Sequence, residues 1–499
     1  MTLFFLVDDF FDFFYFLPEC FLLFFILFIC VILLLHSVSK NYKFPLIGPL
    51  SQWLSIFGLG LTGILIINNI DSSLGLFQTT LLINYAVNNI KLIIIFSTLL
   101  CILGSINFLK NELINDFEYI ILLLLATFSM LLCISAFDMI TLYLTLEIQG
   151  LVFYILVSIK KNTLYNTEAG LKYFILGSLA AIFLLYGFSI IYSLFGTINF
   201  MDISLLCAFP ILNLTVYYGV LNGLFFIVLG FCFKLTVAPF HMWAPDVYEG
   251  APSSISLYLS VVPKIVYTFI LIRLFYFVFL HFFFAFETIL VLMGSLSIII
   301  GSFFGIRQNK LKRLFVYSSI SHIGFIILGI ALGSVVGIQN AYIYLMIYLL
   351  LTLNLWIFYI SLRRQKTNTL NIYINDFNSL YITNPLLSLF FAINIFSLAG
   401  VPPLIGFWVK FLILSSLMEN SLIIVTIVIA FVSGVSAFFY VRLVKILYYS
   451  VDLSPILSFK EISKENALIL AYTFSILILF MLHPDLLILW VSKIVLCHF

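Results

Sequence analysis

The sequence predicts an all-α polytopic membrane protein with about 14 transmembrane helices. Hydrophobic residues make up 64% of the 499 residues and charged residues only 9%, whereas a soluble domain carries about 25% charged residues. Long apolar runs follow one another along the chain, without the alternation of barrel strands. The net charge of +2, without a basic patch, argues against a nucleic-acid partner.

The apolar runs are separated by polar residues, glycine or proline, and each is long enough to cross a bilayer, which takes about 20 residues. Because every backbone amide in lipid must be satisfied internally, we expect each run to be helical. The predicted spans are 18–36, 46–68, 90–109, 118–136, 138–159, 170–195, 219–240, 254–273, 284–305, 314–333, 338–361, 385–417, 422–448 and 466–490.

Basic residues are distributed unevenly between the loops. Loops after even-numbered spans contain almost none, and Lys91 and Arg273 are assigned to the edges of spans. Since basic loops stay on the cytoplasmic or matrix side, both termini are predicted outside, where the acidic cluster Asp8, Asp9 and Asp12 also belongs. The loops after odd-numbered spans contain Lys40, Lys43, Lys110, Lys160, Lys161, Arg307, Lys310, Lys312, Arg313, Arg363, Arg364, Lys366, Lys460 and Lys464.

Two of the spans are predicted to be broken. The seventh runs into Pro239 and the twelfth contains Pro402 and Pro403. Proline removes a backbone donor and clashes with the preceding turn, and unwound backbone at membrane depth survives only inside protein or beside water. Two breaks five spans apart are typical of transporters built from two inverted repeats, with ion sites at the breaks. Ordinary proline kinks are the structural alternative.

Five ionisable residues lie inside predicted spans, where each costs about 2.5–3.5 kcal/mol on insertion scales. We expect all five to be buried and to form a proton relay. A buried lysine can lose and regain a proton as a carboxylate partner moves, and histidine titrates near neutrality. A static ion pair, snorkelling lysines and a structural histidine are the alternatives. The five residues are Glu147, Lys234, Lys264, His322 and Lys410.

Other charged residues are assigned smaller roles. Glu19, at the start of the first span, is either an interface anchor or functional. Asp246 and Glu249 are expected to organise the loop after the first break. Arg307, Lys312 and Arg313 are expected to form a topogenic cluster. The seven cysteines contain no CxxC pair, so we expect neither a disulfide framework nor a metal or iron–sulfur site.

Several blocks, in one order along the chain, resemble subunit 2 of respiratory complex I, the NADH:quinone oxidoreductase family. The most specific is FCFKLTVAPFHMWAPDVYEGAP, from Phe231 to Pro252. Its second half is more similar to subunit 2 than to the sister subunits 4 and 5. Lysine at 410 and the lack of a long lateral helix after the last span favour the same subunit. The other blocks are LYLTLEIQ (142–149), TEAGLKYF (167–174), KRLFVYSSISHIG (312–324) and FSLAGVPP (396–403) through Lys410.

The resemblance implies an antiporter-like fold with two inverted five-helix repeats and broken helices 7 and 12. Residues 1–117 would be a three-helix extension, 118–273 the first repeat, 274–450 the second repeat, and 451–499 a C-terminal helix. It also implies roles for the five residues. Glu147 and Lys234 would pair beside the proton-uptake half-channel, Lys264 and His322 would connect the halves, and Lys410 would be the terminal site of the exit half-channel.

The resemblance further implies a subunit of a proton-translocating NADH:ubiquinone reductase, with no redox chemistry and no cofactor on this chain. NADH, FMN, iron–sulfur clusters and ubiquinone would be bound by other subunits. The expected partners are other membrane-arm subunits, including neighbouring antiporter-like subunits, and membrane lipids.

The Phe-rich composition and the absence of a basic presequence favour the mitochondrial inner membrane, with the termini on the intermembrane-space side. A plastid thylakoid or a bacterial plasma membrane is the alternative location. The alternative functions are a cation/proton antiporter subunit and subunit 2 of a plastid NDH complex. A purely structural scaffold with static charges is a further alternative.

Overall fold

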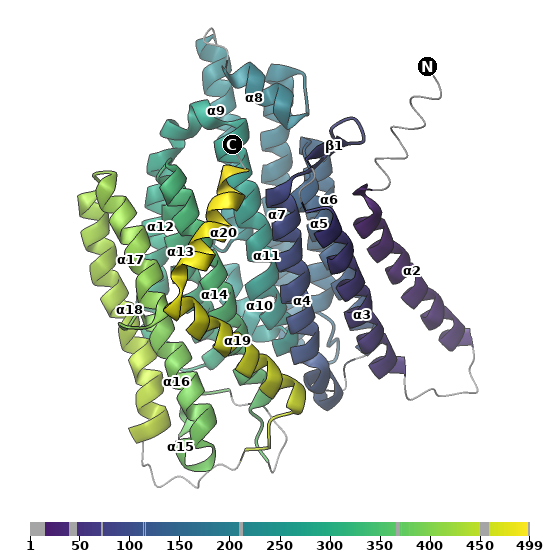
Figure 1. Ribbon diagram of the computed structural model, residues 1–499, viewed down its shortest axis with the longest axis vertical. Helices are drawn as coiled ribbons and strands as arrows, with labels where there is room; N and C mark the ends of the chain where they lie inside the picture. Colours follow the sequence, from purple (N-terminus) through teal and green to yellow (C-terminus); the bar gives the residue numbers. More distant parts are fainter. Residues whose placement is uncertain are drawn as a thin grey trace. The chain divides into compact units, whose positions relative to one another are not determined.

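The computed structural model describes residues 15–38, 47–70, 73–112, 114, 116–208, 213–365, 370, 372–378, 380–449 and 459–497. The acidic cluster Asp8, Asp9 and Asp12 and the basic residues Lys40, Lys43 and Lys366 lie outside these residues. Within the described part of the chain almost every regular element is a helix, as the sequence predicts (Figure 1).

The long helices of the first half follow the predicted spans closely. The helices of this half are α2 (Leu17–Val38), α3 (Ile47–Asn68), α4 (Tyr85–Glu112), α5 (Asp116–Ser135), α6 (Met139–Val157), α7 (Leu164–Phe195), α8 (Phe200–Ala208), α9 (Leu214–Lys234) and α10 (Trp243–Gly250).

The second half is also helical. Its helices are α11 (Ser253–Arg273), α12 (Phe283–Ile306), α13 (Leu311–Ala331), α14 (Val335–Ser361), α15 (Leu380–Thr383), α16 (Pro385–Ala399), α17 (Ile405–Glu419), α18 (Ile423–Tyr449), α19 (Lys464–Leu482) and α20 (Pro484–Leu496). Short turns of other helix types are η1 (Leu274–Val278), η2 (Leu280–Phe282) and η3 (Ile374–Phe377).

The prediction of a polytopic helical membrane protein is confirmed. Of the described helices, 12 are long and apolar enough to cross a membrane, and α16 and the first part of α2 are shorter apolar helices. The structure adds short elements that the sequence did not predict, among them helices α8, α10 and α15 and a hairpin of strands β1 (Leu74–Leu76) and β2 (Leu81–Ile83). The strands have only three residues each, too short for alternation to be visible.

Both predicted breaks are present. Helix α9 ends at Lys234, and eight residues separate it from α10. Helix α16 ends at Ala399, and five residues separate it from α17. The prediction of one continuous fourteenth span over 466–490 is wrong, because the chain leaves helical geometry at His483 between α19 and α20. Pro484 explains this break, since proline disfavours helical backbone in the residue before it.

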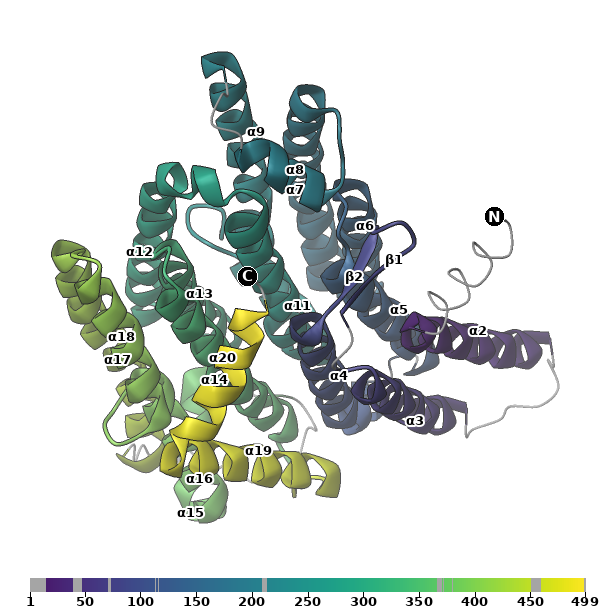
Figure 2. The ribbon, with the colours of Figure 1, turned by 45° about the horizontal axis from the view of Figure 1, so that its top comes forward.

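The chain divides by packing into two compact units, and the predicted four-part division stays a prediction. The first unit comprises residues 1–231, 262–281 and 496–499, and the second comprises 232–261 and 282–495. In the first unit α2, α3 and α4 lie side by side (Figure 2).

In the second unit α12 and α13 pack closely because glycines line their interface. A Cβ atom at Gly324 would lie 2.1 Å from the Ser297 hydroxyl oxygen, and one at Gly301 would lie 2.7 Å from the Tyr317 carbonyl oxygen. This close contact fixes α13, which carries His322.

Candidate functional site

The structure places the five predicted relay residues in two groups. Glu147 on α6 and Lys264 on α11 belong to the first unit, and Lys234, His322 and Lys410 belong to the second. Lys264, His322 and Lys410 are buried, with exposed fractions of 2%, 5% and 7%.

The expectation of full burial is wrong for Glu147 and Lys234, which are partly exposed. Glu147 lies at the margin of an outward face of α6, next to the exposed side chains of Leu144, Ile148 and Leu151. Lys234 is the last residue of α9, where the helix gives way to the break. The side chain's position on its helix, which the sequence does not show, decides its burial.

His322 is hydrogen-bonded at both ring nitrogens. Its Nδ1 lies 2.7 Å from the Tyr344 hydroxyl oxygen on α14, and its Nε2 lies 3.1 Å from the Tyr440 hydroxyl oxygen on α18. A neutral imidazole donates from one nitrogen and accepts at the other, while a tyrosine hydroxyl can do either. The three side chains therefore form a buried chain in which the ring can take up a proton on one side and release it on the other.

Lys410 lies at the second break. Its ammonium donates to the carbonyl oxygens of Leu398, at 2.8 Å, and Ala399, at 2.9 Å, which are the last two residues of α16. The final carbonyls of a helix have no partner within the helix and carry the negative end of its dipole. The break thus supplies a buried position suited to a positive charge.

The chain geometry at this break follows from two glycines. Gly400 has a left-handed backbone (φ 85°), which ends α16 and is accessible to glycine without strain. A Cβ atom at Gly406 would lie 1.7 Å from the Ser397 carbonyl oxygen, so α17 begins in direct contact with the end of α16. One turn after Gly406, Lys410 then reaches back to the free carbonyls.

A small cavity joins the His322 and Lys410 environments. Tyr344, Tyr348 and Ser397 line it together with these two residues. Its volume of about 10 Å³ is room for about one water molecule. The two residues are thus neighbours around one polar space, as a relay between them requires.

At the first break the loop satisfies the end of α9. The Val237 amide donates to the Cys232 carbonyl oxygen at 2.9 Å, and the Trp243 indole donates to the Phe233 carbonyl oxygen at 3.1 Å. The Trp243 ring also stacks on the Phe233 ring, with centroids 5.5 Å apart. The motif after Lys234 therefore stabilises unwound backbone.

The loop after this break is fixed by charge. Glu249 on α10 forms ion pairs with Lys310, at 2.5 Å, and with Arg313, which also contacts Asp246 at 3.0 Å. Lys312 donates to the Ala251 carbonyl oxygen at 2.7 Å. The loop-organising role expected for the two acids has a structural basis, and the basic residues at the start of α13 hold this loop through their contacts. Their topogenic role stays a prediction.

The structure changes the interpretation of two residues near the N-terminus. Lys91 is not at the edge of a span: it lies inside α4 and forms a buried ion pair with Glu19 on α2, with exposed fractions of 2% and 1%. Helix α4 begins five residues before the predicted span. Sequence reasoning therefore placed Lys91 at the edge of a span and did not predict the pair. Glu19 is accordingly a buried partner and not an interface anchor.

Sequence reasoning missed Tyr344 and Tyr440. Both lie within predicted spans in apolar surroundings, where a tyrosine hydroxyl needs a hydrogen-bonding partner. The need of a buried hydroxyl for a partner could have drawn attention to these tyrosines, but it does not indicate which residue is the partner. Only the packing of α13, α14 and α18 shows that both hydroxyls meet His322.

Comparisons with known proteins match this architecture. The family described as "NADH:quinone oxidoreductase/Mrp antiporter, TM" matches residues 136–436, which contain all five predicted relay residues. NADH-ubiquinone oxidoreductase chain 2 of Marchantia polymorpha is 34% identical over 493 residues, covering 97% of this chain and 99% of that protein. NADH-quinone oxidoreductase subunit N of Paramagnetospirillum magneticum is 39% identical over 385 residues, covering 76% of this chain and 77% of that protein.

Solved structures share the fold at lower identity. A chain of Thermus thermophilus respiratory complex I matches with a TM-score of 0.76 and 24% identity, covering 94% of this chain and 98% of that one. A chain of the Mrp complex from Dietzia matches with a TM-score of 0.81 and 16% identity, covering 96% and 97%. The chain therefore has the antiporter-like fold and belongs to the membrane-subunit family of NADH:quinone oxidoreductase and Mrp antiporters, in which its relatives are chain 2 and subunit N.

Proposed function

We propose that this chain is a proton-translocating, antiporter-like membrane-arm subunit of an NADH:ubiquinone oxidoreductase. The observation that carries the proposal is the buried group of His322, Tyr344 and Lys410 around one small cavity at a helix break. Tyr440 joins this group through its hydrogen bond with His322. Burying ionisable side chains inside a membrane protein costs free energy. A buried cluster of such side chains is therefore a candidate for a functional site.

The hydrogen bonds of Lys410 suit the last step of a relay. Two of its N–H groups can donate to the Leu398 and Ala399 carbonyl oxygens whether the amine is neutral or charged. The third position of the nitrogen carries the mobile proton in the charged form and a lone pair in the neutral form. A water in the cavity can pass a proton between this position and the His322 side.

The remaining residues extend the relay. Glu147 and Lys234 act on the uptake side, and Lys264 passes protons towards His322. Partial exposure of Glu147 and Lys234 is compatible with a place where protons enter, because such a site must reach water or a neighbouring subunit. Electron transfer from NADH to quinone in other subunits drives the cycle, and those subunits bind NADH, FMN, iron–sulfur clusters and ubiquinone.

The same proposal includes partners and location. The chain assembles with other membrane-arm subunits, including neighbouring antiporter-like subunits, and with membrane lipids. It resides in the mitochondrial inner membrane with both termini on the intermembrane-space side. Relatives from both plant mitochondrial-type and bacterial enzymes support the enzyme class more than the compartment.

The test is proton pumping by the membrane assembly that contains this chain, reconstituted in vesicles. NADH oxidation should acidify one side of the membrane, and His322→Gln should abolish this while the assembly remains intact. Normal pumping by an assembly with His322→Gln would contradict the relay and support the alternative of a structural scaffold with static charges. Sodium-dependent proton exchange by the isolated chain, without NADH, would instead support the cation/proton antiporter, the function suggested by the Mrp-like fold.

A further inference from the structure

Two cavities in the first unit share Asn199 and Asp202. One is a groove of about 600 Å³ between α6 and α7. The other is a cavity of about 470 Å³ beside the β1–β2 hairpin, called the polar cavity after the Asn84, Asp202 and Arg273 side chains in its otherwise largely apolar lining. We propose that together they bind one zwitterionic phospholipid with a primary ammonium head group, of the phosphatidylethanolamine class. The acyl chains occupy the groove and the head group occupies the polar cavity.

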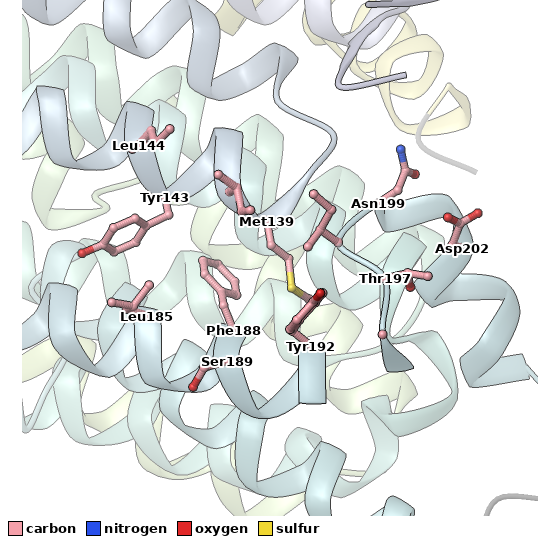
Figure 3. A pocket seen from close by; sticks show the side chains of 13 residues that line it. Met139, Tyr143, Leu144, Leu185, Phe188, Ser189, Tyr192, Thr197, Asn199 and Asp202 are labelled. Atoms are coloured by element: carbon pink, nitrogen blue, oxygen red, sulfur yellow. The ribbon is translucent and has the colours of Figure 1, made fainter. Parts of the chain in front are cut away.

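The groove has the character of an acyl-chain site. Leu144, Leu185 and Phe188 line it, and Figure 3 shows them apart from Thr197, Asn199 and Asp202, which gather at one end. Its volume lies within the range of about 300–1,000 Å³ that is usual for ligand sites. Leu144 and Leu185 are 55% and 49% exposed, so the groove opens sideways from two helices that can span a membrane.

The polar end lies where head groups lie in a membrane. Helix α7 ends at Phe195 and α6 begins at Met139, so the groove's polar end is at the termini of both spans. A backbone bridge between Asp138 and Asn199 joins the two connecting segments there. The ends of membrane-spanning helices reach the membrane–water interface. A lipid bound here therefore places its acyl chains in the groove, at the depth of the membrane interior, and its head group in the polar cavity, at the interface.

Arg273 is fixed in position to meet a phosphate. Its Nη1 donates to the carbonyl oxygens of Ile134, at 2.7 Å, and Ala136, at 3.1 Å, and its guanidinium lies 4.7 Å from the centre of the Phe269 ring. The side chain lines the polar cavity. Arginine has five N–H donors in a rigid fork and is always charged, which suits recognition of phosphate.

The opposite charge is supplied by Asp202. Among the described residues that line the two cavities, Asp202 and Arg273 are the charged ones, one of each sign. This balance fits a head group that is itself zwitterionic. Burial raises the pKa of nearby Asp138, a hydrogen bond from Asn199 lowers it, and the Asp202 charge raises it, with a net increase. At the polar end the Asp202 carboxylate is therefore the group that suits an ammonium group.

Lipid retention by the intact membrane assembly tests the proposal. The delipidated assembly is incubated with phosphatidylcholine vesicles that contain equal shares of dioleoyl phosphatidylethanolamine and phosphatidylglycerol, washed, and analysed by native mass spectrometry. Relative to each lipid's share in the vesicles, we expect severalfold greater retention of phosphatidylethanolamine than of phosphatidylcholine or phosphatidylglycerol, because the primary ammonium donates hydrogen bonds to a carboxylate and a quaternary ammonium does not. Asp202→Asn should reduce this preference, and Leu185→Trp, which fills the groove, should reduce retention of all three lipids.

The control is Ile182→Trp, because Ile182 is 64% exposed on the same helix but does not line the groove. It should retain lipid as the unaltered assembly does. Equal retention of the three lipids, or unchanged retention in both test variants, would overturn the proposal. A high-resolution map of the unaltered assembly gives an answer independent of any variant: two-tailed density in the groove supports the proposal, and side chains of another subunit there refute it.

Discussion

The ammonium of Lys410 donates at 2.9 Å to the carbonyl oxygen of Ala399, the last residue of the helix that precedes the second break. The break and the charge are therefore one structural feature. Without the break these carbonyls would bond to following amides of the same helix, and without the lysine they would be left unsatisfied inside the protein. The fold thus holds a buried lysine on the free carbonyls at the end of a helix.

Replacing Lys410 with glutamine separates its structural role from its proposed chemical one. The amide of Lys410→Gln keeps two N–H donors for Leu398 and Ala399 but cannot bind or release a proton. We expect the assembly to form normally and NADH-driven pumping to fall at least about tenfold, the equivalent of about 1.4 kcal/mol in a barrier. Lys445→Gln, at an exposed lysine of α18, should pump normally. Equal pumping by both variants would contradict the relay.

Tyr440→Phe removes the hydroxyl that meets His322 Nε2 and leaves the ring in place. Loss of one buried hydrogen bond costs about 1–3 kcal/mol of stability, so the assembly should still form. We expect slower proton translocation with the same NADH-binding behaviour, measured as the pumping rate in vesicles. Tyr449→Phe on the same helix is the control, because Tyr449 is 77% exposed. If Tyr440→Phe pumps like the control, this hydroxyl is not on the proton path.

Gly406→Ala tests the close contact that forms the second break. The new Cβ would lie 1.7 Å from the Ser397 carbonyl oxygen, so α16 and α17 must separate. Overpacking of this kind costs about 1–3 kcal/mol or more, and it would also move Lys410 from its carbonyls. Thermal unfolding of the assembly should therefore occur at lower temperature.

The matched control is Gly434→Ala on α18, where nothing lies within 4 Å of the added Cβ. It should stabilise the helix by about 0.5–1 kcal/mol. A Gly406→Ala assembly that unfolds at the temperature of the control would show that the break tolerates separation of the two helices.

The buried Glu19–Lys91 pair should matter for stability and not for pumping. Lys91→Met leaves the Glu19 carboxylate buried without its partner and should cost about 3–5 kcal/mol. The double variant Glu19→Gln/Lys91→Met should recover most of this loss, as chemical denaturation of the assembly would show. Glu168→Ala, which removes an exposed pair with Lys172, should change stability by less than about 1 kcal/mol. Failure of the double variant to recover stability would contradict this account.

The predictable part of the candidate site was its residue types and their place along the chain. Lys410 after the double proline and His322 within an apolar span were visible because charge and proline are expensive in a membrane helix. Tyr344 and Tyr440 were not, because tyrosine is common in apolar segments and its partner lies on another helix. Pro484 itself indicates the break between α19 and α20, but the hydropathy of residues 466–490 as a whole favoured a single span.

By itself, the sequence determined that this protein is a bundle of membrane helices with two breaks and ionisable groups inside it. Hydropathy and proline act locally, so they can be read along the chain. The tertiary structure decided which groups meet: that Lys91 finds Glu19, that Glu147 is partly exposed, and that Lys410 shares a cavity with His322. Such contacts join residues far apart in the chain and depend on which face of each helix packs inward, which no single segment specifies.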